Sequence, residues 1–202
     1  MLHDRVFWRR VATPVEMDLT AIPVQEKILA DPEFTLVQPT LKEVRAGRWR
    51  YATASRGIKA EHYLQQGRRN FAIAHGNLIV ADIWCEPPCT ETRRVRHPDL
   101  KLFGFDCHPG ETYAFDAFID PTYRGHNLAA PLQRFLQQTL KREGCTKVYG
   151  NYYDDNIPAM WMHRMLRFKE LPKRQVSRFF FWVQSTALSP GVKPAPRAIG
   201  KR

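Results

Sequence analysis

The sequence predicts an α/β domain, and three features of the chain lead to that fold class. A strand, an amphipathic helix and a second strand follow one another between residues 112 and 152, which is the order of a βαβ unit. A β-rich hairpin precedes this unit, and a short helix follows it. With 202 residues, 44% of them hydrophobic, the chain can bury one full core. We therefore expect a single domain over residues 1–188, followed by a flexible basic tail over residues 189–202.

The first third of the chain predicts short elements. Residues Val6 to Leu19 alternate loosely between apolar and polar, and predict a pair of strands broken near Pro14. A short strand is expected at Leu36 to Val37. Apolar residues between Ile58 and Leu64 fit one side of a helix, which Gly67 ends.

A hairpin comes next in the chain. The text "NFAIAHGNLIVADIWC" reads as two strands joined by a tight turn at His75, Gly76 and Asn77. Residues 87–98 are polar, basic and flanked by prolines, so we expect them to form an exposed connection.

The βαβ unit consists of a strand at Thr112 to Ile119, a helix at Leu128 to Arg142 and a strand at Lys147 to Tyr152. The helix is predicted because its apolar residues share one face, and Gly144 ends it. These apolar residues are Leu128, Leu132, Phe135, Leu136 and Leu140. The helix should begin beyond the carboxyl end of the first strand. Its free N–H groups and the positive end of its dipole then suit a phosphate group.

The turn from Tyr123 to Asn127 lies directly before this helix. Gly125 lets the backbone approach a ligand, and Asn127 either adopts a left-handed conformation or caps the helix. Arg124 and His126 add hydrogen-bond donors. Because any strand-to-helix turn is rich in glycine and asparagine, the turn alone also fits an ordinary connection.

A second helix is predicted over "NIPAMWMHRMLRF", from Asn156 to Phe168. Asp154, Asp155 or Asn156 is its expected cap, and Pro158 fits its first turn. Apolar and aromatic residues surround the helix almost completely, so we expect it to be largely buried against the sheet.

The net charge of +11, from 31 basic and 20 acidic residues, favours an acidic partner: a phosphorylated cofactor, an acidic carrier protein or a nucleic acid. No zinc-finger or RNP-like pattern supports nucleic acid, which is therefore not expected. The apolar runs are shorter than the roughly 20 residues of a membrane span. The first residues carry no apolar leader. A cytoplasmic protein with no membrane span is expected.

The four cysteines favour free thiols, because they lie mostly in apolar, strand-like text. The spacing of Cys85 and Cys89 could hold a metal ion, but neither a second pair nor a histidine cluster completes four ligands. The sequence therefore predicts no metal site.

Two motifs, in this order, resemble those of the GNAT superfamily of N-acyltransferases, which use acetyl-CoA or another acyl thioester. The family pattern "V-x-P-x-x-R-G-x-G-x-G/A" corresponds to Ile119 to Ala129. The pattern "N-x-x-A-x-x-x-Y-x-x-x-G-F" is matched in register from Asn156 to Phe168. Asn127 replaces the second glycine of the first pattern, while His163 and Arg167 replace the tyrosine and glycine of the second. The resemblance covers about residues 112–183.

The resemblance implies a GNAT-like, mixed and mostly antiparallel central sheet, flanked by helices, that splays between the strands at Thr112 and Lys147. It also implies an enzyme, a GNAT-type N-acetyltransferase whose co-substrate is acetyl-CoA or another acyl-CoA. An amine would attack the thioester carbonyl directly in a ternary complex. The residues that the resemblance places at the acyl-CoA are Ala117, Phe118, Ile119, Arg124, Gly125, His126, Asn127, Leu128, Ala129, Asn156 and Ala159.

The resemblance also suggests catalytic residues. His163 occupies the position of a tyrosine that often protonates the departing thiolate in the family, and an imidazole could do the same. It is equally well explained as a polar residue on a packed helix. Candidates for the general base are Glu111, Tyr113, Asp116, Asp154 and Asp155. Asp116 interrupts the apolar text "YAFDAFI", where a structural hydrogen bond is favoured over a role as base.

Two alternatives compete with the enzyme. One is a GNAT-like binding module that has lost catalysis and holds an acidic ligand, a protein or a nucleic acid. A Rossmann-type dinucleotide protein fits less well, because the turn lacks the first glycine and a suitably placed ribose acid. For the enzyme, the expected partners are a small-molecule or peptide amine acceptor, an acyl-carrier protein as donor, and a second copy of the chain in a homodimer.

Overall fold

The computed structural model describes residues 7–24, 28–179 and 182–188 of the chain. These residues form two compact units, each built from segments that are far apart in the sequence. The central unit comprises residues 18–95 and 107–148, and the terminal unit comprises the described residues up to 17, then 96–106 and from 149 onward. The expected single domain over residues 1–188 stays a prediction, and the expected tail lies outside the described residues.

The sheet of the central unit is mostly antiparallel, as predicted. Its strands follow the order β6 (Glu111–Ile119), β5 (Leu78–Cys85), β4 (Arg69–His75) and β2 (Phe34–Val37). Each strand in this series is antiparallel to its neighbour. The short strand β3 (Arg50–Tyr51) runs parallel to β5.

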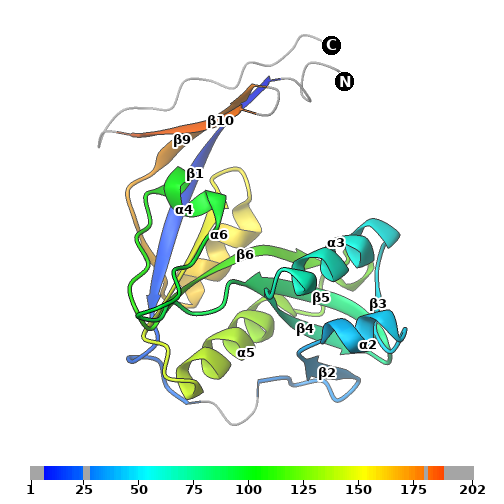
Figure 1. Ribbon diagram of the computed structural model, residues 1–202. Helices are drawn as coiled ribbons and strands as arrows, with labels where there is room; N and C mark the ends of the chain where they lie inside the picture. Colours follow the sequence, from blue (N-terminus) through cyan, green and yellow to red (C-terminus); the bar gives the residue numbers. More distant parts are fainter. Residues whose placement is uncertain (1–6, 25–27, 180–181, 189–202) are drawn as a thin grey trace, which may run out of the picture. The chain divides into compact units, whose positions relative to one another are not determined.

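Helices cover both faces of this sheet (Figure 1). On one face lies α5 (Ala129–Arg142), whose Phe135 ring packs edge-on against Phe71 of β4 at 5.6 Å between centroids. On the other lies α3 (Ala54–Gln65), capped by Thr53 and preceded by α2 (Leu41–Arg45). The helix α5 ends as predicted, because Gly144 follows it with a left-handed φ of 84°.

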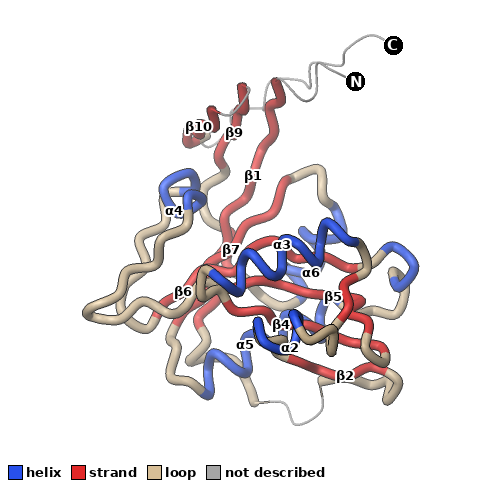
Figure 2. Tube along the Cα trace, turned by 45° about the vertical axis from the view of Figure 1, so that its right-hand side comes forward, coloured by secondary structure: helices blue, strands red, loops and turns tan. Residues whose placement is uncertain are grey.

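The terminal unit is built on neighbouring strands, of which β1 is the longest (Figure 2). Their order is β10 (Trp182–Ala187), β9 (Arg174–Phe179), β1 (Phe7–Asp18) and β7 (Lys147–Tyr153), and the first two residues of β7 belong to the central unit. The short strand β8 (Lys169–Glu170) pairs with the end of β1. Two helices complete the unit, α4 (Pro98–Phe103), which the sequence did not predict, and α6 (Ile157–Met165).

The expected pair of strands before residue 20 is wrong, because β1 is one continuous strand. At Pro14 the strand β1 continues without a break but changes its partner strand. The strand pairs with β9 up to Ala12 and with β8 from Val15. Pro14 lies between the two ladders, where its carbonyl accepts the N–H of Leu171 at 2.8 Å, so its missing N–H costs no ladder bond.

The expected burial of the second helix is also wrong. In α6, only His163 is buried, while Ile157, Trp161 and Met165 are 49%, 62% and 59% exposed. These three residues are spaced by four and so share one outward face. The helix also ends earlier than expected, since Arg167 adopts a left-handed φ of 61°.

Candidate functional site

The strand β6 stops at a proline because the next residues form a short 3₁₀ turn. This turn, η1 (Pro121–Tyr123), is capped by Asp120. The N–H and the hydroxyl of Thr122 donate to Asp120 Oδ1 at 2.9 and 2.8 Å. Pro121 takes the first position of the turn, where no N–H is needed. The chain is thereby redirected toward the start of α5.

Two left-handed residues shape the connection to α5. Gly125 has a φ of 106° and Asn127 a φ of 58°. A Cβ atom added to Gly125 would meet nothing within 4 Å. Residues 124 to 127 are all exposed, so the backbone here is open to a ligand. Of the two roles expected for Asn127, the left-handed conformation is the one observed.

The N-terminus of α5 has free N–H groups. No side chain among the described residues caps this helix, which starts after the buried Leu128. Leu132 N donates to Leu128 O at 3.0 Å, and Pro131 carries no N–H. The amides of Ala129 and Ala130 precede this first helical bond, at the positive end of the helix dipole. Backbone amides in such a position suit an anion such as pyrophosphate.

Aromatic rings fix the turn to the neighbouring strands. The Tyr123 hydroxyl lies 3.1 Å from His75 Nδ1 at the end of β4. The rings of Tyr123 and His126 both pack against Phe34 of β2, with centroids 6.1 and 5.5 Å away. The turn therefore has a defined position on the central unit.

A β-bulge interrupts β6 before this turn. Asp82 of β5 pairs with Phe118, but Trp84, two residues further on, pairs with Phe115 three residues earlier. One extra residue is thus inserted at Asp116–Ala117, and Asp116 adopts a left-handed φ of 52°. A bulge leaves backbone groups without ladder partners. Ala117 is exposed there, so the bulge can offer its backbone to a ligand.

The sequence reasoning missed an ion pair on the α3 side of the bulge. Arg56 of α3 binds Asp82 of β5 with Nε to Oδ1 at 3.0 Å and Nη2 to Oδ2 at 2.7 Å. Trp84 Nε1 donates to the same carboxylate at 2.8 Å. Burial raises the pKa of Asp82, and the bonds from Arg56 and Trp84 oppose that rise. An aspartate inside the apolar text "LIVADIWC" is the signal that could have revealed this pair.

Asp116 joins the same network. Its carboxylate accepts Arg56 Nη1 and Lys59 Nζ, both at 3.0 Å, and its backbone carbonyl accepts Arg56 Nη2 at 2.9 Å. These contacts support the structural role that the sequence favoured over a role as base.

The two proposed bases on β6 lie near its start, far along the strand from the turn. Glu111 is buried and accepts the N–H of His108 at 2.9 Å, while Lys147 Nζ lies 3.2 Å from its carboxylate. Tyr113 is fully buried, with its ring stacked on Phe115 at 5.9 Å. Their catalytic roles stay predictions. In the terminal unit, the other two candidates are paired, Asp154 with Lys173 and Asp155 with Arg10.

The predicted residues of α6 belong to the terminal unit. Asn156 caps the helix, accepting the N–H of Ala159 at 3.3 Å. The buried His163 has its Nδ1 2.7 Å from the carbonyl oxygen of Ala159, stacks on Tyr152 and meets Phe168 edge-on. Burial lowers its pKa, so the neutral ring is favoured. This surrounding resembles a packed core position, and the role of His163 as general acid stays a prediction.

The backbone supports the register of both motifs. The family patterns have glycine where this chain has Asn127 and Arg167, and both residues are left-handed, with φ values of 58° and 61°. Positive φ is uncommon outside glycine. These two positions thus keep the conformation that glycine favours, although neither residue is a glycine.

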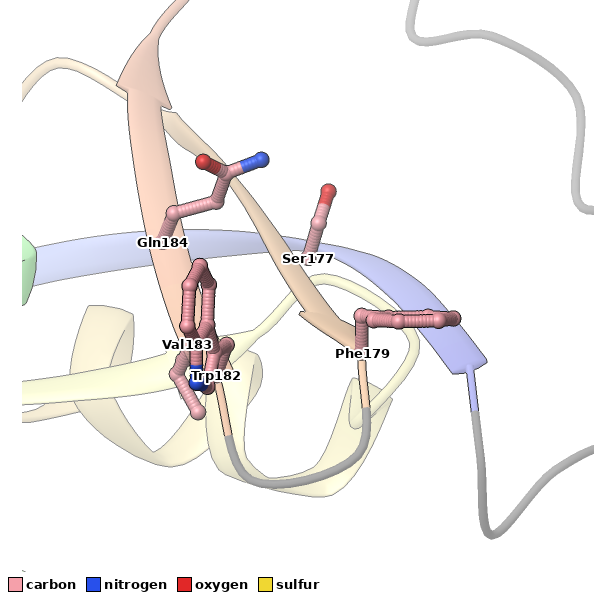
Figure 3. Close-up of a pocket in the computed structure, with 5 residues that line it drawn as sticks. All are labelled: Ser177, Phe179, Trp182, Val183 and Gln184. Atoms are coloured by element: carbon pink, nitrogen blue, oxygen red, sulfur yellow. The ribbon is translucent and has the colours of Figure 1, made fainter.

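Two other features of the protein lie outside this site: the pair Cys85 and Cys89, and a hollow on the surface of the β9–β10 hairpin. Cys85 and Cys89 are buried free thiols, and burial raises the pKa of Cys85 to about 12. A hollow of about 400 Å³ lies on the β9–β10 hairpin. In Figure 3, Trp182 and Val183 lie together on β10, and the ring of Phe179 points away from them. None of the predicted site residues lines it.

Solved structures with the same architecture include acetyltransferases, although no protein-family model matches the chain. The GCN5-related glucosamine N-acetyltransferase region of a fungal multi-domain GH3 β-N-acetylglucosaminidase is 16% identical, with a TM-score of 0.61 over 85% of this chain and 21% of that one. A tandem GNAT protein from the clavulanic acid biosynthesis pathway is 18% identical, with a TM-score of 0.56 over 91% of this chain and 56% of that one. A putative GNAT-family acetyltransferase from Novosphingobium aromaticivorans is 16% identical, with a TM-score of 0.53 over 88% and 66%.

These likenesses show that the chain has the fold of the GNAT acetyltransferases and so confirm, for the fold, the resemblance of the two motifs. The chain spans less than two thirds of several of these proteins, for example 21% and 56% of the first two. Among the described residues, none of the helices is both long and apolar enough to cross a membrane.

Proposed function

We propose that this protein is an N-acyltransferase that moves an acetyl or other acyl group from CoA to an amine. The observation that carries the proposal is the sequence of three backbone features in the central unit. A bulge interrupts β6, an open left-handed turn follows the strand, and an uncapped helix N-terminus comes next. A bulge and a helix N-terminus leave backbone groups without ladder or helix partners, and here both lie along one stretch of chain.

The residues present fit an acyl-CoA. The turn at Gly125 has room for a pyrophosphate, since nothing lies within 4 Å of the Cβ position. Arg124 is exposed, and its guanidinium has no hydrogen-bonding or ionic partner among the described residues, so it can pair with the phosphates. Ala117 is exposed, and Phe118 and Ile119 are partly exposed. This stretch is proposed to pair with the pantetheine arm as another strand would. The roles of Asn156 and Ala159, which belong to the terminal unit, stay predictions.

The reaction proposed is a direct attack. The acceptor nitrogen bonds to the thioester carbonyl carbon, its proton passes to a base or to water, and the carbon–sulfur bond breaks. The leaving thiolate takes a proton from an acid, for which His163 is the candidate. Backbone N–H groups at the bulge would stabilise the negative charge that develops on the carbonyl oxygen. Glu111 and Tyr113 are the proposed bases.

The burial of His163 supports a second candidate function, a GNAT-like binding module without catalysis. A family tyrosine is replaced by a histidine that is 7% exposed and packed between rings. Such a residue fits a binding module that uses the same turn and helix N-terminus and carries out no proton transfer. The two functions differ in turnover and share the binding of a CoA-like ligand. A module for a protein or a nucleic acid would lack that binding.

The proposal is tested by calorimetric titration of the protein with CoA, acetyl-CoA and a long-chain acyl-CoA. Micromolar binding of at least one of them is expected. Protein that binds should then be incubated with acetyl-CoA and amines while free thiol is measured. Because one similar structure is a glucosamine N-acetyltransferase region, the amines should include glucosamine beside peptides. Absence of binding to all three ligands contradicts the proposal, and binding without turnover on any amine favours the binding module.

A further inference from the structure

Arg56 is fixed in place from one side by Asp82. A guanidinium has five N–H donors, and four of them have partners here, two on Asp82 and two on Asp116. Asp82 is 1% exposed and also accepts Trp84 Nε1. Movement of Arg56 would leave a buried carboxylate without its cation, which is costly. The two donors that face β6 therefore stand at a fixed position.

Those two donors hold a strained residue. Asp116 has a φ of 52°, a left-handed conformation that is sterically strained for an L-residue. Such strain persists only where the surroundings hold it. Arg56 donates hydrogen bonds both to the side chain of Asp116, at 3.0 Å, and to its backbone carbonyl, at 2.9 Å. These hydrogen bonds fix the direction of the next peptide group, which carries the N–H of Ala117.

The network is also electrically balanced. Two carboxylates, Asp82 and Asp116, face two cations, Arg56 and Lys59. An unpaired Asp116 at the bulge would repel the negative charge that develops on a thioester carbonyl oxygen during acyl transfer. Pairing removes this repulsion while the bulge keeps its N–H groups.

We propose that Arg56 and Asp116 are positioning residues for the acyl group: they hold the N–H groups of the β6 bulge toward the carbonyl oxygen of a bound acyl thioester. This inference rests on the proposed function. It adds that α3, through Arg56, determines how the donor's acyl end is bound, while the turn at Gly125 binds the CoA end. The two ends of the donor can therefore be perturbed separately.

The test compares acetyl-CoA with CoA on four variants. Arg56→Lys removes the forked contacts, because an ammonium cannot reproduce them. Asp116→Gly removes the side chain that Arg56 and Lys59 hold, and glycine adopts positive φ freely. Asp116→Asn is the conservative rescue, because asparagine tolerates this φ and still accepts a hydrogen bond. Arg45→Lys is the matched control, because Arg45 pairs with Glu61 in an exposed bridge.

Two quantities are measured on each variant, whose fold is checked by circular dichroism. The first is the ratio of the dissociation constants of CoA and acetyl-CoA. The second is amide hydrogen exchange over residues 114–119 without ligand. Wild type should prefer acetyl-CoA. In Arg56→Lys and Asp116→Gly this preference should vanish, exchange should rise roughly tenfold, and CoA affinity should stay within about twofold. Asp116→Asn and Arg45→Lys should behave as wild type.

An unchanged preference in both Arg56→Lys and Asp116→Gly overturns the inference, as does a wild type that binds acetyl-CoA and CoA equally. If Arg56→Lys fails to fold, Asp116→Gly decides alone, since Asp116 is 25% exposed and its loss leaves Asp82 paired. A wild type that binds neither ligand overturns the proposed function as well. If the wild type binds CoA but the preference for acetyl-CoA does not change in the variants, only the inference fails and the proposed function stands.

Discussion

Phe115 and Phe118 of β6 point to the same face of the sheet although they are three positions apart. Phe115 packs edge-on against Tyr63 of α3 at 5.4 Å, and the Phe118 ring lies 4.6 Å from the guanidinium carbon of Arg56. In a regular strand, residues three apart face opposite sides. The bulge at Asp116 restores both rings to the α3 face. The same inserted residue therefore places both rings on the α3 face and exposes the backbone of the bulge.

Removal of Asp82 tests how strongly this side of the sheet depends on the buried pair. Asp82→Ala leaves Arg56 buried without its main partner, so the free energy of unfolding should fall by about 3–5 kcal/mol. Urea denaturation measures it. The control is Glu61→Ala, which removes an exposed bridge to Arg45 and should cost no more than about 1 kcal/mol. Equal effects of the two variants would contradict the role assigned to the pair.

Gly125→Ala tests the phosphate-binding turn. The added methyl group points into open space from which a ligand would approach, so CoA affinity should fall roughly tenfold or more. Gly67→Ala is the matched control, because Gly67 also has a positive φ, of 77°, and nothing within 4 Å of its Cβ position. Both variants should lose similar stability, but only the first should lose CoA binding in calorimetric titration. Unaltered affinity in Gly125→Ala would exclude this turn as the pyrophosphate site.

Arg167→Gly tests the left-handed position at the end of α6. Glycine adopts this conformation without the steric cost that arginine meets, so the protein should become more stable by about 1 kcal/mol. Arg167→Ala removes the same side chain but keeps the steric cost, and it should bring no gain. Thermal unfolding of both variants provides the comparison. A gain in both would point to the side chain instead of the backbone.

His163 should make stability depend on pH. Burial lowers its pKa below the ordinary value of 6.5, so the unfolded chain binds the proton more readily than the folded protein. The contribution is fully present above about pH 6.5 and is lost as the pH falls below it. His163→Phe should reduce the loss of stability between about pH 7.5 and 5.5, measured by urea denaturation. An equal loss in the variant would assign the effect to other groups.

The same variant separates the two roles of His163. If it is only a packed residue, acyl transfer at neutral pH should be retained in His163→Phe. A general acid predicts a large fall in turnover with unchanged CoA affinity. His163→Gln, which keeps a hydrogen-bond donor, gives the intermediate comparison.

Local chemistry made much of this protein predictable. The βαβ elements were found within one residue of their observed ends, because apolar spacing and Gly144 depend only on neighbouring residues. For the cap of α6, Asn156 was one of three candidates, and for Asn127 the left-handed conformation was one of two expected roles; the structure shows both. The exposed stripe of α6 could not be predicted, since a helix that is apolar on most sides does not reveal which side is packed.

The sequence by itself determined the hairpin and the βαβ unit in their order, the turn at Gly125 and the two motifs that resemble the GNAT superfamily. Tertiary structure decided how Asp116 is used. The role of Asp116 depends on Arg56 and Asp82, which lie 60 and 34 positions earlier in the chain. These residues come together only when α3 packs on the sheet. A charge inside an apolar strand shows that a partner must exist, because burial without one is too costly. Only the folded chain shows which residue that partner is.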